Sequence, residues 1–276
     1  MPTIDAFLAA LTLEPVGEDR YRAGNLPSAH GVVFGGQLLA QSIIAGLAGQ
    51  EGKAVKTLHT VFARGASHDA PLDISVERMH AGRSVASSTV TISQGDQICT
   101  RSLVLLSAVE DDVIRHADTR RSTAGPDDVA DHIRGEEAWE LGIIGDVDII
   151  DPELVGPPEL DVWVRFAGAP EDPAIDQALV SYSTDGFLIG TAMRPHKGVG
   201  QAQAHVTLST GVLSHTLTFH EPCPAGQWHL LEQRATYAGH GRSYGRGEIF
   251  RADGQLAASF VQDAMIRARS GSAGKL

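Results

Sequence analysis

Several stretches of the chain have the β-prone composition typical of strands, and one of them is rich in β-branched residues and small hydroxyl residues. This stretch runs from Val85 to Ile92, and it ends in a turn at Gln94-Gly95-Asp96. Long β-prone runs follow at 98–106 and, in the second half of the chain, at 256–266. The second run comes after Asp253-Gly254, a strong hairpin dipeptide. The pattern predicts antiparallel hairpins in both halves.

Each set of strands is preceded by one apolar segment with helical character. The segment from Gly36 to Ala48 is apolar on nearly all sides, as expected of a helix enclosed by a sheet. Its counterpart runs from Pro173 to Met193, with proline suited to the first turn and a break predicted at Asp185-Gly186. Each half is therefore expected to consist of a helix followed by an antiparallel sheet.

An internal repeat supports two related halves. The triplet Gly82-Arg83-Ser84 is followed by Gly95, twelve residues after the arginine, and Gly241-Arg242-Ser243 is followed by Gly254 at the same spacing. Each half also has a His-Thr pair at which we expect a strand to start: His59-Thr60 and His215-Thr216. The shared order and spacing predict a duplicated domain.

Residues 108–158 are acidic and punctuated by proline and glycine, which predicts a linker, with a short helix near Ile133 to Trp139. The expected organisation is an N-terminal domain at 1–108, a linker at 109–158, a C-terminal domain at 159–270 and a tail at 271–276. A length of 276 residues fits two domains of ordinary size.

Composition narrows the classes of function. A net charge of −12 argues against nucleic-acid binding, which needs a basic surface. Two cysteines without a CxxC pair and 12 scattered histidines indicate neither a disulfide framework nor a metal site, and no cofactor is expected. The chain begins without a secretory signal pattern, and its longest apolar stretch is too short to span a bilayer. We expect a cytoplasmic protein.

Several motifs, in order along the chain, carry a family resemblance. They are the segment 30–37 (HGVVFGGQ), the segment 184–188 (TDGFL) followed by 194–196 (RPH), and the segment 261–267 (VQDAMIR). Together they resemble the double-hotdog acyl-CoA thioesterase II family, over almost the whole chain except the linker. The resemblance implies an α+β double hotdog in which each half is a long helix wrapped by an antiparallel sheet.

The resemblance also implies an activity and a partner. The expected reaction is the hydrolysis of acyl-CoA thioesters to free fatty acid and CoA, in lipid metabolism, by a homo-oligomer. In the family, an aspartate, a Thr or Ser hydroxyl and a glutamine of the second domain hold the nucleophilic water. Carried across by position, the glutamine is Gln262, the hydroxyl is Thr236, and the aspartate position is taken by Ser214.

Serine cannot act as a general base at neutral pH without help, so the base must be sought elsewhere. Asp185 at the predicted helix break is one candidate, although such a residue can equally cap the backbone. His59 and His215 can titrate near neutral pH, although histidines in strands are more often structural. Asp263 neighbours Gln262 but points to the other face of the strand by alternation.

The candidate substrate-binding residues are Gly35, Gly36 and His59. Backbone N–H groups at a helix start can stabilise an oxyanion, and glycine lets a ligand approach the backbone closely. The alternative is that both glycines serve helix packing. The expected pocket combines Gly36 with Thr236 and Gln262, and the first half has no site of its own, since Leu103 stands at the position of Gln262.

Two other classes of function compete with hydrolysis. A non-catalytic protein that binds acyl-CoA or an acyl carrier would explain the missing aspartate. A hydratase would need an Asp-His pair in the loop before the helix, where His30 stands without a well-placed aspartate. The glycine-rich segment 239–245 misses the G-x-G-x-x-G spacing and is expected to form an exposed hairpin.

Overall fold

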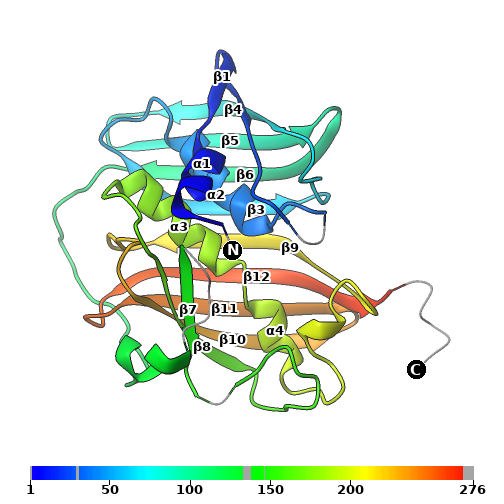
Figure 1. The fold of residues 1–276 in the computed structure, drawn as a ribbon. Coiled ribbons are helices and arrows are strands. Elements are labelled where there is room, and N and C mark those ends of the chain that lie inside the picture. The colour runs from blue at the N-terminus through cyan, green and yellow to red at the C-terminus, as the bar shows by residue number, and fades with distance from the viewer. Residues whose placement is uncertain (1, 29–30, 133–137, 146, 270–276) are drawn as a thin grey trace.

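A computed structural model describes residues 2–28, 31–132, 138–145 and 147–269. Its strands form one 12-stranded sheet, in which all neighbouring strands are antiparallel (Figure 1). The strand order is β1-β2-β4-β5-β6-β3-β9-β12-β11-β10-β8-β7. The elements of the first half are α1 (Ile4–Leu11), β1 (Glu14–Gly17), β2 (Arg20–Ala23), α2 (Gly35–Leu47), β3 (Ala54–Phe62), β4 (Leu72–Ala81), β5 (Val85–Gln94) and β6 (Gln97–Ser107). Those of the remainder are η1 (Pro126–His132), β7 (Trp139–Ile143), β8 (Glu159–Phe166), α3 (Pro173–Thr184), α4 (Leu188–Met193), η2 (Gln201–Gln203), β9 (Leu208–Phe219), β10 (His229–Gly239), β11 (Arg242–Arg251) and β12 (Leu256–Ala268).

The strand order shows that the two halves repeat one plan. A hairpin (β1–β2 or β7–β8) precedes a helix (α2 or α3), and four strands follow it. The halves join where β3 pairs with β9, with Thr60 opposite His215 and His59 opposite Thr216. This is the α+β double hotdog predicted from the sequence.

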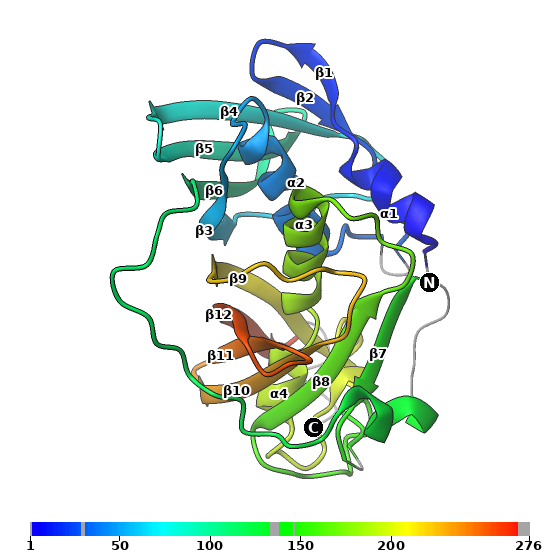
Figure 2. The same cartoon turned by 90° about the vertical axis from the view of Figure 1, so that its left-hand side faces the viewer.

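The two long helices pack against each other on one side of the sheet, which curls round them, with β7 and β8 closing the far side (Figure 2). Leu39 and Ile43 of α2 and Val180 of α3 are fully buried in this contact layer. Gln177 of α3 also bonds both backbone groups of Val55 in β3, at 2.9 and 2.8 Å. The start of α2 at Gly36 lies against Tyr182 near the end of α3, and Leu47 at the end of α2 lines a pocket with Pro173 at the start of α3, so the two helices run antiparallel.

Several sequence predictions are confirmed in detail. The first helix is α2, and the second breaks into α3 and α4 at Asp185-Gly186-Phe187. The predicted turns at Gly95 and Gly254 join β5 to β6 and β11 to β12, and both glycines have the positive φ that such turns require. The segment 239–245 forms the expected hairpin, with Gly239 paired to Arg242.

The predicted strand starts at His59 and His215 are wrong. β3 already begins at Ala54 and β9 at Leu208, so both histidines lie within strands. The reason is burial upstream: Val55 and Leu58 pack into the core and extend β3 toward its N-terminus. His215 is therefore held by strand residues on both sides of it in β9.

The segment predicted as a linker contributes to the second half. It carries η1 and β7, and β7 pairs with β8 from Trp139 opposite Phe166 to Ile143 opposite Val162. Of the helix predicted near Ile133 to Trp139, residues 133–137 lie outside the described residues, as does the predicted tail at 271–276, and Trp139 begins β7. Before η1, the backbone N–H groups of Arg121 and Ser122 bond the buried carboxylate of Glu232 on β10.

Among the described residues, no helix combines the length and the apolar character needed to cross a membrane.

Candidate active site

Asp185 stands where the end of α3 meets the start of α2. It is the C-cap residue of α3, its side chain is buried at 8% exposure, and its carboxylate accepts a hydrogen bond from the backbone N–H of Gly36. Its second oxygen, Oδ1, has no hydrogen-bond partner within the described parts of the chain. The predicted candidate base and the predicted glycines thus lie together.

The start of α2 is shaped to receive this carboxylate. Its N-cap is Phe34, whose side chain makes no capping hydrogen bond. The first backbone N–H groups of α2 are therefore available to an anionic group from elsewhere in the chain. Glycine is required by space: a Cβ at Gly35 would lie 2.5 Å from Asp185 Oδ2, and a Cβ at Gly36 would lie 2.4 Å from the Tyr182 carbonyl oxygen. The two glycines therefore let α3 and its carboxylate approach the backbone of α2.

Burial changes the acidity of this carboxyl group. Desolvation raises the pKa of Asp185 from its ordinary value to about 7, and the hydrogen bond from Gly36 opposes part of that rise. The pKa of the neighbouring Tyr182 hydroxyl is also raised, first by burial and then by the charge of Asp185. Aromatic rings make the surroundings apolar, since Tyr182 packs edge-on against Phe34 at 4.8 Å and Trp139 at 5.3 Å. A carboxyl group with a pKa near 7 suits proton transfer at neutral pH.

A second group of polar residues reaches the same helix end from the sheet. His215 of β9 lies opposite Gln262 of β12, and both side chains are almost fully buried. The Nδ1 atom of His215 is 3.2 Å from Gln262 Oε1, and its Nε2 atom is 2.9 Å from the hydroxyl of Thr184, the residue before Asp185. The free amide atom of Gln262, Nε2, has no partner within the described segments.

Two other predicted residues, Ser214 and His59, lie apart from this group. Ser214 points to the opposite face of β9, where its hydroxyl donates to Asp263 at 3.2 Å on the outside of the sheet. His59 is on that outer face too, with Nδ1 2.7 Å from the Thr216 hydroxyl. The position that carries the family's aspartate therefore does not face Gln262 in this chain.

Thr236 lies next to the row of residues that contains Gln262. Gln262 is opposite Gly245, Gly245 is opposite Ala235, and Thr236 follows at a β-bulge in β10. Its side chain is exposed, and its hydroxyl has no hydrogen bond to another described side chain or backbone group. The structure brings Gly35, Gly36, Asp185 and Gln262 to one end of the helix pair, and leaves Thr236 at its margin.

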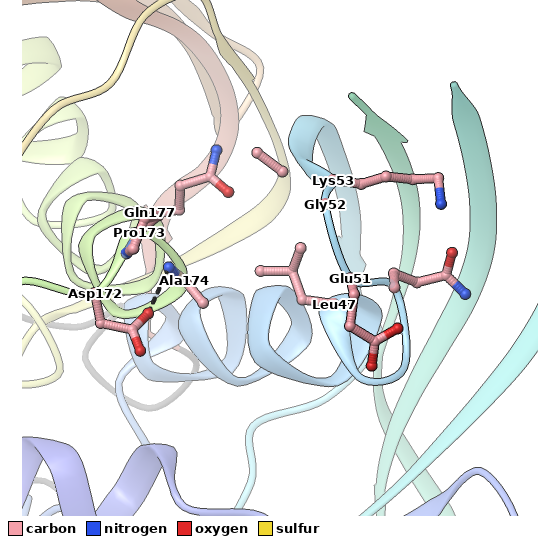
Figure 3. Close-up of a pocket in the computed structure, with 10 residues that line it drawn as sticks. Leu47, Glu51, Gly52, Lys53, Asp172, Pro173, Ala174 and Gln177 are labelled. Carbon is pink, nitrogen blue, oxygen red and sulfur yellow. Dashed lines mark hydrogen bonds between the residues drawn. The ribbon is translucent and has the colours of Figure 1, made fainter. Parts of the chain in front are cut away.

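The opposite end of the helix pair offers a comparison. There the start of α3 meets the end of α2 beside an open pocket of about 280 Å³ (Figure 3). Asp172 caps α3 with its own carboxylate, which accepts from the N–H groups of Ala174 and Ile175. Leu47, near the end of α2, lines this pocket, whereas the end of α3 carries Asp185. The two helix starts are thus dissimilar: one is self-capped and the other is met by a buried carboxylate.

Sequence reasoning missed Thr184. Its hydroxyl is fully buried and joins His215 to the helix end, a contact between residues 31 positions apart. The one sequence signal that could have indicated Thr184 as a site residue is its position directly before Asp185 at the helix break. In the part of the chain that the structure describes, no group of three or more His, Cys, Asp or Glu residues is arranged to hold a metal ion.

Comparison with protein families matches both halves of the chain. Residues 23–107 match the model of the acyl-CoA thioesterase N-terminal domain, and residues 118–266 match that of the acyl-CoA thioesterase C-terminal domain. The chain is 27% identical over 289 residues to acyl-coenzyme A thioesterase 8 of Rattus norvegicus, which covers 95% of this chain and 88% of that protein. It is 26% identical to acyl-CoA thioesterase 2 of Haemophilus influenzae, with 93% and 95% covered.

Solved structures agree with these matches. An acyl-CoA thioesterase II from Mycobacterium marinum superposes with a TM-score of 0.80 at 25% identity, covering 96% of this chain and 98% of that one. A tesB protein from Mycobacterium avium subspecies paratuberculosis shares the fold, with a TM-score of 0.81 at 22% identity over 96% of this chain and all of the other. The chain therefore belongs to the acyl-CoA thioesterase II family.

Proposed function

We propose that this enzyme hydrolyses acyl-CoA thioesters at the junction of α2 and α3, with Asp185 as the general base. The observation that carries the proposal is the buried carboxylate of Asp185, whose pKa is raised to about 7 and whose Oδ1 has no partner among the described residues. Such a group is basic enough at neutral pH to take a proton from water and acidic enough to return it.

The reaction follows from these atoms. Asp185 Oδ1 takes one proton from a water molecule as the water oxygen attacks the thioester carbon, and the carbonyl oxygen becomes an oxyanion. The positive end of the α2 dipole favours this charge. Collapse of the intermediate breaks the C–S bond, and the proton on Asp185 passes to the CoA sulfur. The products are a free fatty acid and CoA.

Gln262 is the second candidate residue of this site. Its buried amide has one atom without a partner among the described residues, and burial of an amide without a hydrogen bond is costly, so a ligand or water is expected there. His215 joins Gln262 on the sheet to Thr184, the residue before Asp185, so hydrogen bonds link the two candidate residues through one ring. We infer that they hold the attacking water between them.

Replacement of Gln262 tests the site directly. We expect Gln262→Ala to lower kcat for CoA release by about 100-fold, as loss of a polar group that orients the reaction can do. The measurement is steady-state release of free CoA from acyl-CoAs of increasing chain length. Gln233→Ala is the matched control, since Gln233 is also a fully buried glutamine of the same sheet without a side-chain partner among the described residues. Equal losses of kcat in both variants would contradict the assignment of Gln262. Binding of acyl-CoA by the wild-type protein without any release of CoA would contradict the proposed hydrolytic activity.

The pH dependence tests the base. Asp185 must be ionised to accept a proton, so we expect kcat/KM to rise with pH and to level off above an apparent pKa of about 7. A profile that is flat from pH 5 to pH 9, measured with the wild-type enzyme, would exclude Asp185 as the group that limits the reaction.

Two features of the chain bear on where the enzyme works and how it assembles. Cys99 and Cys223 are both free and buried, which fits a reducing compartment, and we infer cytoplasmic lipid metabolism. The sheet ends in the strands β1 and β7, whose outer edges pair with no other described strand, and such edges favour self-association of the chain. A homo-oligomer remains our prediction.

A further inference from the structure

His215 links the sheet to the end of α3 by hydrogen bonds on both sides of its ring. The ring is fully buried and is stacked on Phe260, with ring centroids 5.7 Å apart and planes inclined by 17°. Its Nε2 atom faces Thr184 and its Nδ1 atom faces Gln262. Because the ring cannot turn freely in this packing, the proton on one of its nitrogens decides how both neighbours are oriented.

The ring is neutral at the pH of the reaction. Burial lowers the pKa of His215 to about 4. A neutral imidazole has one N–H donor and one nitrogen that accepts. One neighbour of His215 must therefore act as an acceptor and the other as a donor.

Thr184 identifies which nitrogen carries the proton. Its hydroxyl donates to the carbonyl oxygen of Ser181 at 2.7 Å, so its single hydrogen is already used. Toward His215, at 2.9 Å, the hydroxyl oxygen can then only accept. The proton of the ring is accordingly on Nε2, and Nδ1 presents a lone pair to Gln262.

A lone pair on Nδ1 requires a donor, and the only donor of the Gln262 side chain is its NH₂ group. The structure places Oε1 of Gln262 3.2 Å from Nδ1 and leaves Nε2 of Gln262 without a partner among the described residues. Two acceptors cannot bond each other, and the two ends of a primary amide have nearly the same shape, so exchanging them restores a hydrogen bond to the ring. We propose that His215 is a positioning residue, which holds the NH₂ group of Gln262 against Nδ1 and turns the carbonyl oxygen of Gln262 toward the attacking water.

This orientation matches what the reaction needs, and it rests on the function proposed above. A water molecule has two hydrogens, and two acceptors, Asp185 Oδ1 and the Gln262 oxygen, can take both of them. The lone pairs of the water oxygen are then free to attack the thioester carbon. An NH₂ group in the same place would donate to the water oxygen and occupy one of those lone pairs, which would weaken the nucleophile.

The protonation state of the ring can be read without any assay of activity. We expect ¹⁵N spectra of the histidine-labelled wild-type enzyme at pH 7.5 to show His215 protonated on Nε2 and unprotonated on Nδ1. The resonances are assigned by their absence in His215→Phe or, if that variant does not fold, in His215→Gln. A proton on Nδ1 would overturn the proposal. Because this readout needs no turnover, it stands or falls separately from the proposed hydrolysis.

A double-mutant cycle tests whether His215 acts through Gln262. We expect His215→Phe to lower kcat by about tenfold or more with little change in KM, and Gln262→Ala to cost less than about threefold when added to it, because residues that act together are not additive. His229→Phe is the control, since His229 is equally buried on the same sheet and its Nδ1 faces the Gln227 carbonyl. A full Gln262→Ala effect in the His215→Phe background would overturn the proposal, as would an equal loss of kcat in His229→Phe.

Discussion

Asp185→Asn should lower kcat by about 10² to 10⁴-fold, the range expected for loss of a general base. Asparagine keeps the shape of the side chain and can still accept from the N–H of Gly36, but it cannot take a proton from water. The measurement is single-substrate CoA release at pH 8, where the wild-type carboxyl group is ionised, because its pKa is raised to about 7. KM should change little if the substrate is held by other groups.

Stability gives this variant an internal check. The folded state raises the pKa of Asp185 above its unfolded value, so the folded protein binds the extra proton between about pH 4 and pH 7. The contribution of Asp185 to stability is therefore present at low pH and is lost as pH rises through 7. Asp185→Asn should melt at a higher temperature than wild type at pH 8, measured by calorimetry, and the gain should shrink toward pH 4.

Asp176→Asn is the matched control for both measurements. Asp176 is a partly buried carboxylate on the same helix, its pKa is also raised by burial, and it accepts from the N–H of Ala225 at 2.7 Å. It lies in the first turn of α3, away from Asp185 at the helix end. If the two variants lost activity equally, the loss would reflect the state of α3 and the base would lie elsewhere.

Gly35→Ala should reduce kcat/KM by about 100-fold, because a displacement of roughly 1 Å can cost that much in a positioned site. The added methyl group would stand 2.5 Å from Asp185 Oδ2 and 3.2 Å from the Phe62 ring, so the carboxylate must move away from the start of α2. Alanine is otherwise favourable within a helix, so thermal stability should fall less than activity does. Steady-state kinetics and thermal unfolding of the same preparation separate the two effects.

Gly24→Ala provides the comparison for this substitution. Gly24 precedes α2 in the same half of the chain and is exposed, and apart from its own chain neighbours no described heavy atom lies within 4 Å of the place where a Cβ would stand. It should keep near wild-type kcat/KM. Retention of full activity by Gly35→Ala would mean that the Asp185 carboxylate need not be held at the start of α2.

The fold could be predicted from sequence because its signals are local. Apolar residues all round 36–48, proline at the start of α3 and glycines with positive φ in two hairpins each act over a few residues. The strand β7 gave no such signal, because five residues inside an acidic segment become a strand only by pairing with β8. The strand boundaries at His59 and His215 failed similarly, since burial in the assembled core extends both strands.

The candidate site was less accessible to sequence reasoning. Gly35, Gly36, Asp185 and Gln262 could each be named from motifs, but their relation could not, since it depends on two antiparallel helices whose ends meet. The contacts of His215 with Thr184 and Gln262 join residues 31 and 47 positions apart in the chain. Ser214 shows that a match to a family position does not place a side chain in the site, because Ser214 faces Asp263 on the outside of the sheet.

The unequal helix starts have a consequence for how such an enzyme can evolve. In a symmetrical dimer of identical single-domain chains, any change at one helix start would appear at both. Within one duplicated chain, Asp172 is free to cap α3, a contact that typically contributes about 1 kcal/mol, while Phe34 leaves α2 without a side-chain cap. If Asp185 is the base, as we propose, one end of the helix pair serves stability and the other serves the reaction, an arrangement that identical subunits could not reach.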